Sequence, residues 1–282
     1  MKIVRIAVLV CSVAAACSGQ GLPIEPKKMA GDSVSPVFEG WFRNSDGTFS
    51  LLFGYFNRNR GQAIDVPVGA GNRIEPGGPD QGQPTHFVPG RGWGMFTIKV
   101  PADFGDKKML WTLVTNGETI AVPGTLHVDY ELAPFSDAGG NSAPILGFDE
   151  KGQTAQGPQP LSVSRTAKVG APLALSAWIT DDGKVNRTSG GRPREGTPPI
   201  TLRWIQYRGP GPVTFREERP AAEKIEWRGP DSKFTGKSTT TATFSQPGEY
   251  VLNLSVNDYS GEGGSGFQCC WTTGKVKVSV GP

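Results

Sequence analysis

Two things are scarce in this sequence of 282 residues: long apolar runs and helical periodicity. A membrane-spanning helix needs about 20 apolar residues, whereas the run Ile6–Ala16 has about eleven and no later run is long enough. After residue 20, Ala, Leu, Glu and Lys never build an amphipathic run of three turns. The sequence therefore predicts neither an integral membrane protein nor a helical fold.

Histidine is also scarce, which limits the possible catalytic sites. His86 and His127 stand far apart, no G-x-S-x-G or H-E-x-x-H motif occurs, and neither histidine has neighbours at metal-ligand spacing. We interpret both as surface or half-buried residues and predict a protein that is not an enzyme. Paired carboxylates remain a less favoured alternative, because a polysaccharide hydrolase needs two of them roughly 5–10 Å apart in space, not in sequence.

The composition favours an all-β protein of two domains. Glycine (39 residues) and proline (24 residues) are abundant and aromatics are well supplied, which is typical of many turns between short buried strands. The net charge of +3 indicates no strong attraction to nucleic acid. We expect no nucleic-acid partner.

The first residues have the layout of a secretory signal peptide. Lys2 and Arg5 precede the apolar run, and small residues follow it. "AAAC" resembles a bacterial lipoprotein box, in which Cys17 is lipidated; the alternative is cleavage after Ala16 or Gly19 and release. We expect a signal over 1–19, a tether over 20–35, and an extracytoplasmic protein: periplasmic, anchored to the outer membrane through Cys17 alone, or secreted.

Strand-like runs then define two antiparallel β-sandwich domains. In the first, over 36–134, Asp-Gly and Asn-Gly turns mark two hairpins, and both faces of the run around Leu51, Phe53 and Tyr55 are apolar. Residues 135–160 are rich in Gly, Pro, Ser and Gln and are predicted to be a linker. The second domain, over 161–282, has period-two runs such as Tyr250, Leu252, Leu254 and Val256.

The second domain resembles a PKD-type immunoglobulin-like domain over about 165–280. The resemblance rests on Val169-Gly170, on Trp204, on "FSQPGEYVLNLSV" (244–256) and on the final "VKVSV". The family's usual "FGDG" is replaced by "IQYRGPG", and an insertion follows the second strand. The resemblance implies a binding or spacer module of extracytoplasmic proteins and implies no catalysis.

Two loops of such a sandwich lie at the same pole and carry acidic residues. The oxygen ligands that Ca²⁺ prefers are offered by Asp181, Asp182, Asn257, Asp258 and Glu262. The simpler interpretation, which we favour, is that these residues end strands and shape turns. No cofactor is otherwise predicted. The insertion at this pole carries Arg192 and Arg194 and is either a solvated loop or a contact for an anionic group.

Cys269 and Cys270 are adjacent, and the other cysteines, Cys11 and Cys17, lie in or at the end of the signal. Adjacent Cα atoms lie about 3.8 Å apart, whereas a relaxed disulfide needs roughly 4.4–6.8 Å. The alternatives are a vicinal disulfide in a chain kinked at that point, two thiols on opposite faces of a strand, or an intermolecular bridge. Trp271 beside them belongs either to the core or to an exposed apolar platform.

These observations predict a non-catalytic binding or presentation protein of the bacterial cell envelope, with a glycan or an envelope protein as ligand. A structural spacer is the alternative. The expected binding site is the loop pole of the second domain, with the following residues: Asp181, Asp182, Arg192, Arg194, Asp258 and Trp271.

Overall fold

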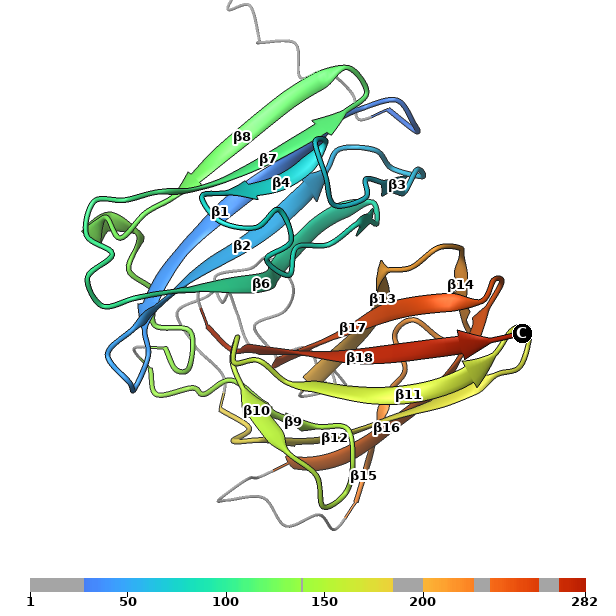
Figure 1. Cartoon of the computed structure of the whole chain (residues 1–282). Coiled ribbons are helices and arrows are strands. Elements are labelled where there is room, and N and C mark those ends of the chain that lie inside the picture. Colours follow the sequence, from blue (N-terminus) through green and yellow to red (C-terminus); the bar gives the residue numbers. More distant parts are fainter. Residues whose placement is uncertain (1–27, 138, 185–199, 226–233, 259–268) are drawn as a thin grey trace, which may run out of the picture.

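The computed structural model describes residues 28–137, 139–184, 200–225, 234–258 and 269–282 (Figure 1). Their regular structure is β-strand apart from one 3-10 turn, η1 (Val128–Tyr130), which confirms the all-β prediction. No helix in this part of the chain is long and apolar enough to cross a membrane. The signal peptide, Cys17, Arg192, Arg194 and Glu262 lie outside the described residues.

The first unit, as we call strands β1 to β8, contains two three-stranded sheets. One has the order β1 (Val34–Arg43), β2 (Phe49–Asn57), β6 (Gly90–Val100). The other has the order β4 (Asn72–Glu75), β7 (Met109–Thr115), β8 (Glu118–Gly124), and β3 (Ile64–Asp65) pairs with β5 (His86–Phe87). Both hairpins are confirmed, since β1 pairs with β2 and β7 with β8.

Aromatic side chains fill the core between these sheets. The Phe53 ring stacks on Phe96 at 5.4 Å, and Trp111 meets Phe96 edge-on at 5.0 Å. Strand β2 is central and covered on both faces, as predicted, because Leu51 and Leu52 point to opposite faces and both are fully buried.

The predicted tether is in part bound to this unit. The N–H groups of Gly31 and Asp32 donate to the side chains of Gln62 and Asn59 at 2.8 and 2.7 Å, and β1 begins at Val34. A flexible tether over 28–35 was therefore wrong for this stretch, because polar side chains after β2 supply hydrogen-bond partners for its backbone.

The second unit, strands β9 to β18, is a sandwich with a four-stranded sheet on one side. The order in that sheet is β11 (Ser162–Lys168), β18 (Trp271–Gly281), β17 (Gly248–Asp258), β13 (Ile200–Arg208). β11 runs parallel to β18, whereas the other pairs are antiparallel. The opposing sheet contains β12 (Leu173–Asp181), β16 (Phe234–Phe244), β14 (Val213–Phe215) and β15 (Ala222–Lys224). The predicted inward faces are buried, including Trp204 and Tyr250 to Val256.

Part of the predicted linker belongs to this second sheet. β9 (Ile145–Gly147) pairs with β12 and with β10 (Thr154–Gln156). Leu146 and Phe148 are buried in the core of the second unit, where the Phe148 ring lies 5.9 Å from Trp204. The linker prediction is therefore wrong for β9 and β10, which belong to the second unit because burial stabilises their apolar side chains.

Candidate functional site

The acidic residues predicted to form the binding pole come together, but they are buried. Asp181 ends β12 and Asp258 ends β17, and their side chains are 4% and 1% exposed. Asn141 Nδ2 donates to Asp258 Oδ2, and the Ser142 N–H donates to Asp182 Oδ2 at 3.1 Å. Residues of the predicted linker therefore cover this pole and bind one oxygen each of Asp258 and Asp182, whereas the buried Asp181 Oδ1 has no hydrogen-bond partner among the described residues.

The predicted Ca²⁺ ligands that the structure describes do not form a metal site. Asp181 Oδ2 accepts from the Gly183 N–H and Asp182 Oδ1 accepts from the Lys184 N–H, both at 2.8 Å. Each carboxylate thus shapes a turn at the end of a strand. Asn257 is also buried, and the described part of the chain holds no group of three or more His, Cys, Asp or Glu that could bind a metal ion.

The pKa of Asp181 is unusual for a carboxyl group. Burial raises it from 3.8 to about 7; the Gly183 N–H opposes the shift, and the carboxylates of Asp258 and Asp182 add to it. The folded state therefore holds a proton on Asp181 at pH values where the unfolded chain has released it. The resulting stability is present at low pH and is lost as pH rises from about 4 to about 7.

Asp181→Asn should remove this loss, because the amide cannot ionise. We expect the variant to gain about 2 kcal/mol or more of unfolding free energy relative to wild type when pH is raised from 5 to 8, since one pKa unit corresponds to about 1.4 kcal/mol. Urea unfolding of both proteins at the two pH values measures this difference. An equal effect of the substitution at pH 5 and pH 8 would contradict the assignment.

The two cysteines lie at the same covered pole. Their Sγ atoms lie at disulfide distance, their Cα atoms are 3.7 Å apart, and both residues are buried. Cys270 has φ +83° and β18 begins only at Trp271, so the chain is kinked here and the pair precedes the strand. The sulfurs lie 3.7 and 3.5 Å from the Asn141 carbonyl oxygen. The kink that a vicinal disulfide requires is therefore present, and the bond itself stays a prediction.

A vicinal disulfide predicts a specific alkylation pattern. The mature protein, unfolded in guanidinium so that burial protects nothing, should take up no iodoacetamide at Cys269 and Cys270 before reduction and two equivalents after it. Peptide mass spectrometry distinguishes these states. Two alkylated residues without reduction would contradict the bond, and a covalent dimer in unreduced samples would indicate the intermolecular alternative.

Trp271 joins the two units and is not an exposed platform. Its side chain is 3% exposed and packs with Leu52 of the first unit and with Leu132, whose N–H donates to the Trp41 carbonyl of β1. Gly94 in β6 makes room for it, since a Cβ at Gly94 would lie 2.6 Å from Trp271 Nε1. The core alternative for Trp271 therefore holds, but the core lies between the units.

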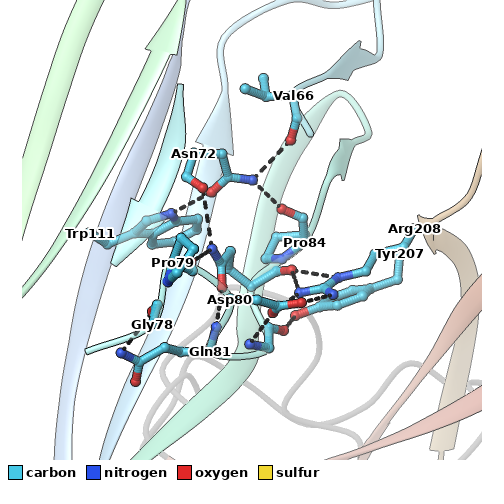
Figure 2. Close-up of polar contacts among 12 residues, drawn as sticks. Val66, Asn72, Gly78, Pro79, Asp80, Gln81, Pro84, Trp111, Tyr207 and Arg208 are labelled. Carbon is cyan, nitrogen blue, oxygen red and sulfur yellow. Dashed lines mark hydrogen bonds and ion pairs between the residues drawn. The ribbon is translucent and has the colours of Figure 1, made fainter. Parts of the chain in front are cut away.

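A second contact between the units is polar and comes from the turn-rich loop after β4 (Figure 2). Asp80 binds the Arg208 guanidinium through both oxygens at 2.8 and 2.9 Å. Tyr207 donates its hydroxyl to the Gly82 carbonyl, and the Thr85 N–H donates to the Tyr207 carbonyl at 3.1 Å. Tyr207 also packs into the core of the first unit, so the two units share a core at β13.

A cleft of about 740 Å³ lies between these two contacts. Figure 1 shows β6 of the first unit facing β17 and β18 of the second. The first unit contributes β6, the turn between β1 and β2, and the loop at Gln81 and Gly82; the second contributes β18, the end of β13 and the segment 158–162. Domain interfaces are a common place for ligand pockets, and the cleft is our candidate site.

The chemistry of this cleft depends mainly on the ammonium group of Lys275. Its side chain is half-buried, and Nζ lies 4.1 Å from the centre of the Tyr207 ring. Among the described residues, no carboxylate oxygen lies within ion-pair distance of this ammonium group. Burial lowers the pKa of Lys275 to about 7; Arg208 and Lys277 add to the shift and Asp80 opposes it.

Sequence reasoning missed this site. The alternation of Lys275, Val276, Lys277 and Val278 showed that the lysines would face away from the core of the second unit. It did not show that the first unit covers this face and leaves a cleft over it. Arg208 and Asp80, 128 positions apart, have no local signal for their pairing.

Comparison with known proteins gives no family. No family model matches the chain. No curated protein matches it either.

Among solved structures, the chain is similar to a PapD-like domain of human CEP192 (10% identity, TM-score 0.23, 43% of this chain and 82% of that one). It is similar to domains 4 and 5 of the S-layer protein SbsC (10% identity, TM-score 0.23, 89% and 98%). It is also similar to AggA, a fimbrial major subunit from Escherichia coli (16% identity, TM-score 0.18, 43% and 89%). At these scores the similarities carry no argument about function.

Proposed function

We propose that this protein is a non-catalytic, extracytoplasmic binding or presentation protein of the bacterial cell envelope, and that a glycan binds in the cleft between its units. The observation that carries the proposal is the cleft itself, which lies between the two contacts that join the units. It contains a half-buried ammonium group that has no carboxylate partner among the described residues.

The lining of the cleft suits a sugar chain. Apolar surface comes from the half-buried Val251, while Phe96, Leu161 and Tyr207 line the cleft with side chains that are themselves largely buried. Amides and hydroxyls surround it, as a ligand with many hydroxyl groups requires: Asn44, Ser50, Gln81, Thr97, Gln159, Ser162 and Thr273. Pockets that combine apolar walls with a few placed polar groups fix the orientation of a ligand.

The same lining supports binding over hydrolysis. A glycosidase needs two carboxyl groups facing each other across roughly 5–10 Å. Of the residues that line this cleft, Asp46 alone carries a carboxylate, and Lys99 Nζ binds it at 2.6 Å. The spacer alternative has support of its own, since the shared core at Tyr207 would make a stiff rod of the two units.

A bulky residue in the cleft tests the proposal without changing a charge. Ser162 lines the cleft, whereas Ser164 is exposed on the same face of β11 and does not line it. We expect wild type to bind at least one of dextran, dextran sulfate and polygalacturonate in isothermal titration calorimetry. Ser162→Trp should weaken that binding by about tenfold or more, because the indole fills the site.

Ser164→Trp is the matched control and should bind like wild type. Absence of binding to all three polysaccharides would overturn the glycan proposal and favour the spacer. Equal affinities of the two tryptophan variants would place the ligand outside the cleft and would also overturn it.

A further inference from the structure

Cations gather on both walls of the cleft. Lys275 and Lys277 are two positions apart in β18, so their side chains leave the same face of the sheet. Arg208 at the end of β13 lies close enough to influence Lys275, and Lys99 of β6 lines the cleft from the first unit.

The acidic groups nearby are already engaged by two of these cations. Asp46 binds Lys99 at 2.6 Å, and Asp80 binds Arg208 through both of its oxygens. Neither Lys275 nor Lys277 has an ion-pair partner among the described residues. The positive charge over this part of β18 is therefore uncompensated within the described chain.

The ammonium group of Lys275 is also held in place. It lies over the face of Tyr207, which is a favourable position for a cation. Tyr207 is itself fixed, because its side chain is 1% exposed and its hydroxyl donates to the Gly82 carbonyl. A positioned, partly desolvated cation costs free energy unless an anion joins it, so the site is better suited to an anionic ligand than to a neutral one.

We propose that the cleft selects acidic glycans, whose carboxylate or sulfate group binds to Lys275 and Lys277 while the sugar ring lies against Val251. This inference rests on the proposed glycan-binding function and names the class of glycan. Charge-assisted hydrogen bonds from two ammonium groups provide the selectivity.

The affinity for the acidic ligand should fall as pH rises. Lys275 carries its charge below about pH 7, and the bound anion stabilises the charged form. Binding therefore takes up a proton above that pH and weakens between pH 6.5 and 8.5. The charged and titratable groups that face Lys275, from the strands and loops around the cleft, are the following: Asp46, Asp80, Lys99, Tyr207, Arg208 and Lys277.

The experiment compares each acidic glycan with its neutral counterpart. Polygalacturonate is paired with its methyl ester, and dextran sulfate with dextran, in calorimetric titrations of the full chain at pH 6.5 and 8.5. We expect wild type to bind at least one acidic member about tenfold or more tightly than its neutral counterpart, as two charge-assisted hydrogen bonds allow. The pair that shows this selectivity identifies the anionic group as a carboxylate or a sulfate.

Lys275→Gln should abolish that selectivity, and Lys277→Gln, at an exposed position that tolerates substitution, should reduce it. Lys107→Gln and Lys108→Gln remove the same charge from exposed positions that do not line the cleft and should leave it unchanged. Equal losses in all four variants would indicate general attraction of polyanions to a basic protein and would overturn the inference.

Equal affinity of wild type for acidic and neutral glycans would also overturn the inference. If Ser162→Trp still blocked this unselective glycan binding, the proposed glycan-binding function would stand and only the selectivity for acidic glycans would be lost. Loss of both the selectivity and the effect of Ser162→Trp would remove the proposed function as well, so the two failures are distinguishable.

Discussion

Trp271→Ala is expected to lower the free energy of unfolding by about 3–5 kcal/mol, the range for removing a large aromatic side chain from a core. The indole is 3% exposed and packs with Leu52 and Leu132, so its removal leaves a cavity between the units. The two units would have to move together to close this cavity, because Trp271 comes from the second unit and Leu52 and Gly94 come from one sheet of the first. Denaturant unfolding followed by circular dichroism measures the loss.

Trp178→Ala is the matched control, since it removes the same side chain from the outer face of β12. Trp178 is half-exposed and contacts Lys237 at 4.8 Å, so we expect a loss of about 1 kcal/mol or less. Losses of equal size would show that Trp271 makes no special contribution between the units.

Gly94→Ala tests the same contact from the other side. An added methyl group would collide with Trp271, and φ of +52° adds backbone strain. Gly105→Ala has the same strain, with φ +57°, but its nearest atom is 3.9 Å away. Left-handed strain costs roughly 1–2 kcal/mol in both variants, and we expect Gly94→Ala to lose about 2 kcal/mol more. Equal losses would mean that Trp271 does not lie against Gly94.

Asn72→Ala is the second substitution with a large expected effect. The side chain is fully buried; its Nδ2 donates to the Val66 and Pro84 carbonyls, and its Oδ1 accepts from Trp111 Nε1 (Figure 2). Alanine would leave three buried polar groups without partners, at about 1–3 kcal/mol each. We expect a loss of about 3–5 kcal/mol in urea unfolding, and release of the loop that holds Tyr207 and Arg208.

Gln81→Ala is the control in the same loop. Gln81 Nε2 donates to the Pro76 and Gly78 carbonyls at 3.1 and 3.3 Å, in a region that solvent reaches. Water replaces these bonds, so a loss of less than about 1 kcal/mol is expected. A small effect of Asn72→Ala, comparable with that of Gln81→Ala, would contradict the role assigned to Asn72.

Local patterns predicted the strands well because their causes are local. Asn116-Gly117 forms a hairpin turn since both residues adopt positive φ, and the predicted inward side chains Tyr250, Leu252, Leu254 and Val256 are all buried. The segment around Leu146 was misjudged because the surrounding glycine and proline residues suggested a linker, although two apolar side chains were enough to bring it into a sheet.

The candidate site depends on contacts that the sequence does not specify locally. Asp181 and Asp258 do meet at one pole, as the sandwich topology required, but Asn141 and its neighbours cover them. The cleft lies where the outer face of β18, in the second unit, meets β6 of the first unit. Its position follows from Trp271 fitting against Gly94 and Arg208 meeting Asp80, and such pairs become visible only in three dimensions.

The central claim is that the cleft between the joined units binds an acidic glycan. A titration of the isotope-labelled protein with an oligogalacturonate, followed by two-dimensional NMR of backbone amides, tests it most directly. We predict that the amides with the largest shift changes lie in 94–99, in 273–277 and at Gln159, Leu161 and Ser162 between them in the cleft. Shift changes confined to the outer face of β12 and β16, or none at saturating ligand, would contradict the account.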